Sequence, residues 1–291
     1  MIAEDIDELL TFDSVLEQTL KDIGIPPRPE IIDRIAVEMI KSEPHFRKLG
    51  QLIGADLGLS ASLIKTANSS YFGFHGRVSS PSQALMMLGL NVACSTIAGI
   101  SLRNAFTANI HLERFLYTSA QLAALSGWLT RIIDKVNLRA DEAYTFGLFR
   151  DCGIPVMLRR FPAYAGILAR ANDDSYQLFT QVERQGLPEL PIDHALVGCL
   201  LAKNWLLPKE ICLAIRHHHE ILAIDSGLPA VSRYLIAIGQ TAEHILHQLT
   251  GDVRTREWTK LGASCLRLLD LTEEELEAHY EEARDVLTSV E

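Results

Sequence analysis

Apolar residues along this chain recur at spacings of three and four over most of its length, which is the period of a helix that buries one face. No segment shows sustained alternation of apolar and polar residues bounded by hairpin turns, so the pattern predicts no strands. In residues 30–40 the expected inner face carries Ile31, Ile32, Ile35, Met39 and Ile40. We therefore predict an all-α fold.

Several helix ends are marked by proline, glycine and capping residues. An opening helix over 5–21 is expected to stop before the Gly24–Pro29 segment, whose prolines cannot continue a helix. The Ser80–Gln83 and Thr272–Glu275 segments both have the residue order of a capping box, which starts a helix. Further helices are predicted over 112–136, 142–150, 176–185, 193–205, 208–218, 229–249 and 272–287.

An uncharged stretch from Val78 to Leu102 is long enough to resemble a membrane span. It includes a proline, two glycines and several amide or hydroxyl side chains, which a bilayer core disfavours. We therefore predict a buried pair of helices here and no membrane anchor.

Composition places the chain among water-soluble globular proteins, with 291 residues of which 48% are hydrophobic and 22% charged. The formal net charge of -10 provides no overall positive field for phosphate backbones, so a nucleic-acid partner is not expected. Five scattered cysteines without a CxxC pair indicate reduced core thiols, and the acidic N-terminus lacks the features of a signal peptide. We predict a cytoplasmic protein without a membrane partner.

The candidates for chemistry are histidines and a carboxylate on separate predicted helices. Asp151 lies in the segment 147–153, His194 begins a later helix, and His217 and His218 lie near the end of another. Side chains that converge from successive helices of a bundle can build a metal site or a general acid/base site. We expect Asp151, His194 and either His217 or His218 to meet if such a site exists.

Each of these histidines also has a structural interpretation. His194 follows Asp193 at a helix start, where it can hydrogen-bond to the backbone. Consecutive histidines at a helix end can interact with the negative end of the helix dipole. A structural role is therefore the expected one for His194 and for at least two of the three histidines at 217–219.

In their order along the chain, these motifs resemble those of the HDOD family, the HD-related output branch of the HD phosphohydrolase superfamily. The resemblance covers about 26–219. The motifs that carry it are Asp56–Leu59, Ser62–Ser69, Ala84–Gly89, Gly147–Gly153, His194–Gly198, Trp205–Pro208 and Ile215–His218. The second of these motifs ends in Asn68 and Ser69. We expect Asn68 and Ser69 to end a helix with a hydrogen-bonded turn.

The resemblance implies a compact multi-helix HD-like bundle with an additional N-terminal helical lobe. The expected division is an N-terminal helix over 1–24, the HDOD domain over 25–220, and a C-terminal helical extension over 221–291 that packs on the domain.

Catalytic HD enzymes, as the family implies, bind one or two divalent metals through a histidine, an adjacent His–Asp pair and a later aspartate. The matching positions here are Thr118, Arg150 with Asp151, and Gln240. Only Asp151 retains its ligand, because Thr118 and Gln240 are weak neutral ligands and Arg150 is a fixed cation. We further expect the Arg150 guanidinium to pair with a nearby carboxylate and replace the lost positive charge.

The sequence therefore predicts a non-catalytic module of bacterial signal transduction, which is what the family resemblance implies. Such a module would bind a protein partner or a small signalling ligand, and it would need no cofactor. The alternative is a divergent metal-dependent phosphohydrolase whose centre is rebuilt from Asp151, His194 and His217 or His218 around a divalent metal.

Overall fold

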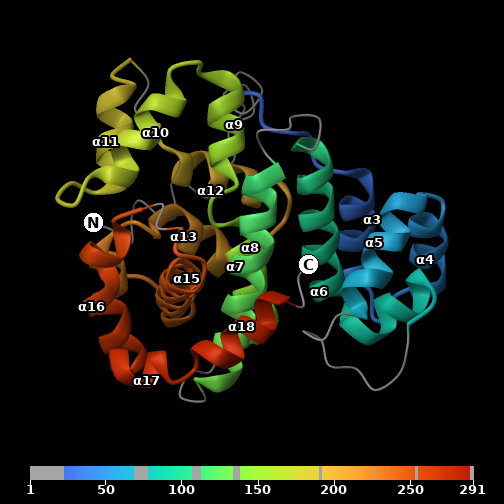
Figure 1. Ribbon diagram of the computed structural model, residues 1–291. Helices are drawn as coiled ribbons and strands as arrows, with labels where there is room; N and C mark the ends of the chain where they lie inside the picture. The colour runs from blue at the N-terminus through green and yellow to red at the C-terminus, as the bar shows by residue number, and fades with distance from the viewer. Residues whose placement is uncertain are drawn as a thin grey trace. The chain divides into compact units, whose positions relative to one another are not determined.

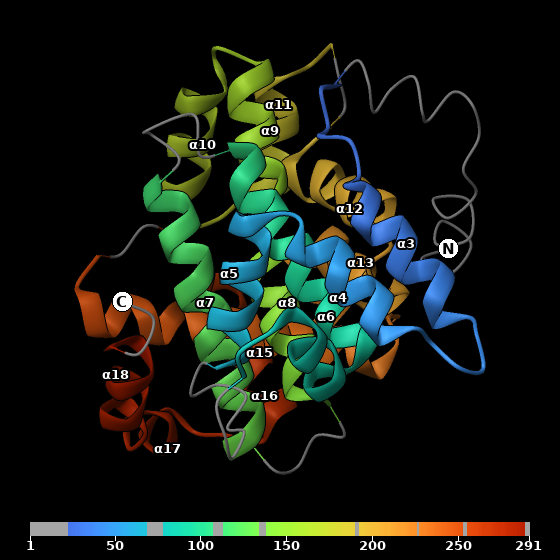
Figure 2. The ribbon, with the colours of Figure 1, turned by 90° about the vertical axis from the view of Figure 1, so that its right-hand side faces the viewer.

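The computed structural model describes residues 23–68, 78–106, 113–133, 138–189, 192–225, 227–252 and 255–288. Within these ranges the chain forms helices and no strand, which confirms the all-α prediction. The helices belong to two compact units (Figures 1 and 2). The predicted helix over 5–21 and Ser69 lie outside the described residues.

The smaller unit comprises residues 26–117 and 204–207. Its helices are α3 (Glu30–Met39), α4 (Phe46–Gly54), α5 (Leu57–Ala67) and α6 (Pro81–Phe106). The side chains at the centre of this unit are apolar and almost completely buried: Ile32, Ile35, Leu49, Ile53, Leu63, Leu85 and Ile97. The 204–207 segment is attached by Trp205, whose ring nitrogen donates to the carbonyl of Pro26 at 3.1 Å.

The end of α3 differs from the sequence prediction. Ile32 and Ile35 are fully buried, as expected, but Met39 is 41% and Ile40 86% exposed. Met39 is the last residue of the helix and the chain turns at Ile40, so Ile40 lies beyond the helical spacing and Met39 lies at the exposed end of the helix.

The uncharged stretch forms α6, and Gly89 divides it into two helical parts. Gly89 has φ 74° and ψ 163°, a backbone conformation that glycine adopts without steric cost. By length and composition α6 resembles a membrane span, but 56% of its most apolar stretch is buried in the protein. The predicted pair of helices is thus present, and just over half of its most apolar stretch is buried.

Asn68 caps the end of α5 and reaches across to the start of the next described segment. Its side-chain amide donates to the Val78 carbonyl at 2.7 Å and accepts from the Val78 N–H at 2.8 Å. Both backbone groups of Val78 are therefore satisfied by one side chain, which agrees with the structural role expected for Asn68.

The larger unit comprises residues 118–203 and 208 onward, together with 23–25 among the described residues. Its helices are α7 (Glu113–Ile132, which begins in the smaller unit), α8 (Ala140–Phe149), α9 (Gly153–Arg160), α10 (Tyr164–Asp173), α11 (Phe179–Gly186), α12 (His194–Asn204), α13 (Lys209–His217), α14 (Ile221–Asp225), α15 (Ala230–Thr250), α16 (Glu257–Leu269), α17 (Glu273–Glu277) and α18 (Tyr280–Thr288).

Helix α15 is the centre of the larger unit and packs against α8, α13, α14, α16 and α18. Figure 1 shows it nearly end-on among its neighbours. Leu235, Ile236 and Ile238 on α15 are fully buried. This core joins helices from before and after residue 220 within one unit.

The predicted helix over 272–287 is two helices, α17 and α18. The Thr272–Glu275 capping box that opens α17 is present, as the sequence predicts. The interruption at residues 278–279 lies where His279 packs edge-on against Trp128 of α7, with 6.2 Å between ring centroids. A contact across the fold accompanies this break, and no local sequence signal marks it.

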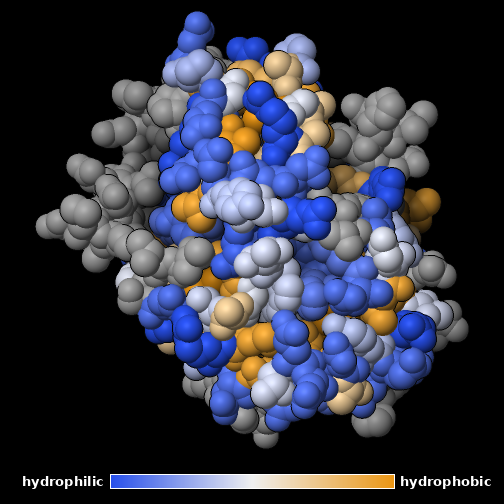
Figure 3. Space-filling view, turned by 60° about the vertical axis from the view of Figure 1, so that its left-hand side comes forward, coloured by the Kyte–Doolittle hydropathy of each residue, from blue (hydrophilic) through white to orange (hydrophobic). Residues whose placement is uncertain are grey.

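Hydrophilic residues cover most of the described surface on the face in Figure 3. Hydrophobic residues gather there only in small, separate areas.

Gly153 allows the start of α9 to lie directly against the start of α12. A Cβ atom at this position would lie 2.0 Å from the carbonyl oxygen of His194 and 2.8 Å from the backbone nitrogen of Gly198. Backbone atoms cannot rotate away as a side chain can, so only glycine permits this approach.

We expect Gly153→Ala to lower the free energy of unfolding by about 1–3 kcal/mol, because the added methyl group forces two helix starts apart. Gly166→Ala is the matched control, since a Cβ atom there meets nothing within 4 Å and the exposed site lies in α10. That control should gain about 0.5–1 kcal/mol from helix propensity. Denaturant unfolding measures the free energy of unfolding of both variants. Equal values for the two variants would contradict the prediction.

Candidate metal centre

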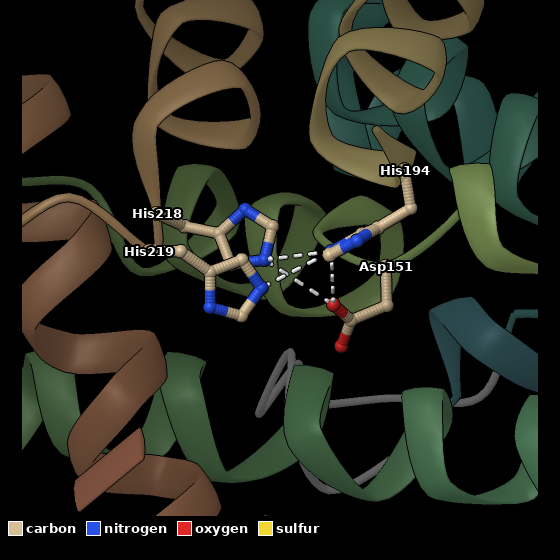
Figure 4. A group of neighbouring side chains, drawn as sticks. All are labelled: Asp151, His194, His218 and His219. Carbon is tan, nitrogen blue, oxygen red and sulfur yellow. Dashed lines mark hydrogen bonds and ion pairs between the residues drawn. The ribbon is translucent and has the colours of Figure 1, made fainter. Parts of the chain in front are cut away.

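Asp151, His194, His218 and His219 direct ligand atoms toward one point inside the larger unit (Figure 4). Asp151 lies in the turn between α8 and α9, and His194 is the first residue of α12. His218 and His219 directly follow α13, and Figure 4 shows their rings side by side and opposite that of His194. The ligand atoms all lie within 4.8 Å of one another.

Local structure fixes the position of His194. Asp193 precedes it and accepts the N–H of Leu196 at 2.7 Å, which starts α12 at His194. Arg184 of α11 donates to the same aspartate at 2.7 Å, so the helix start is attached to a neighbouring helix.

Four of the six separations between ligand atoms are close to those of a tetrahedral metal site. His194 Nε2 lies 3.3 Å from His218 Nε2 and 3.1 Å from His219 Nε2. Asp151 Oδ1 lies 3.3 Å from His218 Nε2 and 3.6 Å from His194 Nε2. Metal–ligand bonds of about 2.0–2.1 Å in tetrahedral geometry place neighbouring ligand atoms about 3.3 Å apart.

Hydrogen bonds at the opposite ring nitrogens orient all three imidazoles. The Nδ1 atom of His194 lies 2.8 Å from Glu183, and that of His219 lies 2.6 Å from Glu257. His218 Nδ1 lies 2.7 Å from the carbonyl oxygen of Ile215. Because carbonyl and carboxylate oxygens accept hydrogen bonds, each Nδ1 carries a proton and each Nε2 atom points into the cluster. There an Nε2 atom can hold a second proton or offer its lone pair to a metal ion.

Burial and neighbouring charges set the protonation of the four residues. Burial lowers the pKa of His218, and burial together with the other two histidines holds the pKa of His219 well below its usual value. Burial opposes the charged form of His194, but Glu183 and Asp151 outweigh it and raise the pKa of His194 to about 10. Burial also opposes ionisation of Asp151, yet Arg150 and the facing histidines hold the pKa of Asp151 well below its usual value.

Arg150 lies beside the cluster and is only 2% exposed. Its guanidinium pairs with Asp151 Oδ2 at 3.3 Å and with Glu243 at 3.0 Å, and it donates to the Gly239 carbonyl at 3.0 Å. The pairing with a nearby carboxylate that the sequence suggested for Arg150 is therefore present. Glu243 and Gly239 come from α15, so this arginine also connects the cluster to the central helix.

The structure places the remaining sequence candidates outside the cluster. His217 turns to Glu220, with 3.0 Å between Nδ1 and Oε2. Gln240 is buried and donates to the backbone carbonyl of His218 at 3.0 Å, so it braces a ligand residue. Thr118 lies in α7 and is not one of the four cluster residues.

Sequence reasoning did not identify His219, Glu183 and Glu257 as members or neighbours of the site. His219 belongs to the histidine run, but its position in that run does not show which rings turn inward after the helix ends. Glu183 and Glu257 are the single acidic residues of α11 and α16, but the sequence does not show that either of them faces inward. Both are buried, and this is the property that sets them apart.

The donor set fits a transition-metal ion. Three imidazole nitrogens and one carboxylate oxygen are ligands that suit zinc and related ions. The three histidines are at most 3% exposed, and the side chain of Asp151 is 16% exposed. The four residues together supply a full set of protein ligands for tetrahedral coordination.

The fold and this cluster define an all-α protein with a buried site able to hold a metal ion. A family model for the HDOD domain matches residues 25–221, and the chain belongs to this family. A relative from Treponema pallidum (strain Nichols), named only as an uncharacterized protein, is 27% identical over 205 residues. That alignment covers 68% of this chain, but this chain spans only 38% of the relative's length.

Solved structures share the fold at low sequence identity. An HDOD domain protein of unknown function from Geobacter sulfurreducens is 20% identical with a TM-score of 0.64, covering 94% of this chain and 97% of that chain. A candidate phosphohydrolase from Shewanella amazonensis SB2B is 17% identical with a TM-score of 0.65, covering 96% and 98%. A candidate signal transduction protein from Marinobacter aquaeolei VT8 is 22% identical with a TM-score of 0.64, covering 96% and 60%.

We expect His219→Ala to abolish stoichiometric metal binding, whereas the adjacent His217→Ala retains it. His219 Nε2 lies in the cluster, but His217 pairs with Glu220 outside it. Plasma mass spectrometry of protein purified without an affinity tag measures the metal content of both variants. Loss of metal from His217→Ala, with retention in His219→Ala, would show that the cluster is not the binding site.

Proposed function

We propose that this chain is a non-catalytic HDOD module that acts by binding a protein partner or a small signalling ligand, and that a metal ion in the His/Asp cluster stabilises its fold. The observation that carries this proposal is the complete ligand set of Asp151, His194, His218 and His219. Catalytic zinc sites keep one position open for water or substrate, whereas structural sites are closed by four protein ligands.

The burial of the cluster supports the same proposal. A phosphoester must reach the metal so that the ion can polarise a phosphoryl oxygen and supply hydroxide. His194 and His218 are fully buried, and Phe179 stacks on His219 with 4.4 Å between ring centroids. These contacts leave the metal-facing atoms of the histidines remote from solvent.

A divergent metal-dependent phosphohydrolase is the second candidate, and one observation favours it. The side chains of Asp151 and Glu243 are 16% and 15% exposed, so solvent approaches the cluster from the carboxylate side. Displacement of Asp151 from the ion would open a coordination position there. The two candidates therefore differ in whether Asp151 remains bound.

A hydrolysis assay separates the two candidates. Full-length protein loaded with zinc, manganese or iron(II) should release no more phosphate from phosphomonoesters, and cleave no more phosphodiester, than Asp151→Ala at the same concentration. Metal-dependent turnover that is present in the wild type and lost in Asp151→Ala, with the fold retained by circular dichroism, would support the enzyme instead.

Chelation of the metal should lower the melting temperature of the wild type. An ion that binds only the folded state adds about 4 kcal/mol of stability when its free concentration is about 1,000 times its Kd. Asp151→Ala removes one ligand and should show a much smaller chelator effect. Calorimetry with and without chelator measures the melting temperatures of the wild type and of Asp151→Ala. A wild-type melting temperature that chelator does not change would contradict a structural metal.

A further inference from the structure

We propose that Arg150 acts as a built-in second cation, which holds the outer oxygen of Asp151 and limits the centre to a single, tetrahedrally coordinated divalent metal ion. This inference rests on the metal occupancy included in the proposed function. It assigns Arg150 a positioning role and defines the class and number of ions that the cluster takes.

The two oxygens of Asp151 face different partners. Oδ1 lies 3.3 Å from His218 Nε2 and 3.6 Å from His194 Nε2, within the cluster. Oδ2 lies 3.3 Å from Nε of Arg150. A carboxylate arranged in this way bridges the ligand position on one side and a guanidinium on the other, so its outer oxygen is not available to a second ion.

The position of Arg150 is fixed from several sides. Its Nη1 and Nη2 atoms are held by the Gly239 carbonyl and by Glu243, both on α15. The guanidinium carries a permanent charge and a planar set of donors, so it can hold three acceptors at once in a defined geometry. Nε is buried and makes no hydrogen bond, so its contact with Asp151 is an ion pair that depends on that aspartate staying in place.

The permanent charge of Arg150 also opposes a second ion. The guanidinium is only 2% exposed and lies 3.3 Å from Asp151 Oδ2 and 3.0 Å from Glu243. A second divalent ion on the outer oxygen of Asp151 would lie beside this cation, and like charges repel strongly where water does not separate them.

The experiment uses full-length protein that has been stripped with chelator and reloaded with cobalt(II) or zinc. Native mass spectrometry should count one ion per chain at saturating metal. Cobalt(II) should give the intense visible absorption of tetrahedral coordination, which octahedral cobalt lacks. Two ions per chain, no bound ion, or a weak octahedral spectrum would overturn the inference.

Variants test the role of Arg150 directly. Arg150→Met should weaken metal binding about 10- to 100-fold and shift the cobalt spectrum, because Asp151 loses the group that orients it. Arg150→Lys keeps a charge but cannot hold all three acceptors, so a smaller loss of affinity and a spectral shift are expected. Arg139→Met is the control, since its ion pair with Asp141 is exposed and local.

Wild-type affinity and spectrum in Arg150→Met would overturn the inference, even if that variant melts at a lower temperature. If Arg150→Met does not fold, wild-type metal affinity and an unchanged cobalt spectrum in Arg150→Lys would overturn the inference instead. These outcomes are distinct from failure of the proposed function: phosphoester turnover by a protein with one tetrahedral ion would remove the non-catalytic assignment and leave the role of Arg150 intact.

Discussion

Three imidazole Nε2 atoms and one carboxylate oxygen converge in the interior of the larger unit, and this arrangement requires positive charge at its centre. Lone pairs about 3 Å apart repel one another unless a proton or a metal ion lies between them. Water cannot screen the repulsion, because His194 and His218 are fully buried. The surrounding structure holds these groups together by fixing each imidazole from behind with a carboxylate or a carbonyl oxygen.

The elements that build this centre come from a long span of the chain. The ligands lie between residues 151 and 219, inside the family-matched region. Glu243, which pairs with Arg150, and Glu257, which orients His219, lie beyond residue 221. Helices α15 and α16 therefore contribute residues to the site as well as to the fold.

Whether this centre can hydrolyse a phosphoester depends on how the protein coordinates the metal ion. Metal-assisted hydrolysis needs an ion with an open position, and here four protein side chains offer one ligand atom each to the same point. Arg150 adds to this difference because it places a guanidinium where catalytic HD enzymes, as the family resemblance implies, have a metal-binding histidine. A guanidinium provides charge and hydrogen bonds, but it cannot bind a metal ion or activate water.

The sequence alone determined the all-helical class, the interrupted apolar helix α6, the capping residues of α17 and the family. These follow from local periodicity, from turn residues and from ordered motifs, each of which is a property of neighbouring residues. It also suggested that Asp151, His194 and one later histidine could meet. Tertiary structure alone decided that His218 and His219 join them while His217 turns away, and that Glu183 and Glu257 stand behind the rings. The physical reason is that ligand geometry and buried hydrogen bonds join residues tens of positions apart, whose relative placement is set by how helices pack and not by their spacing in the chain.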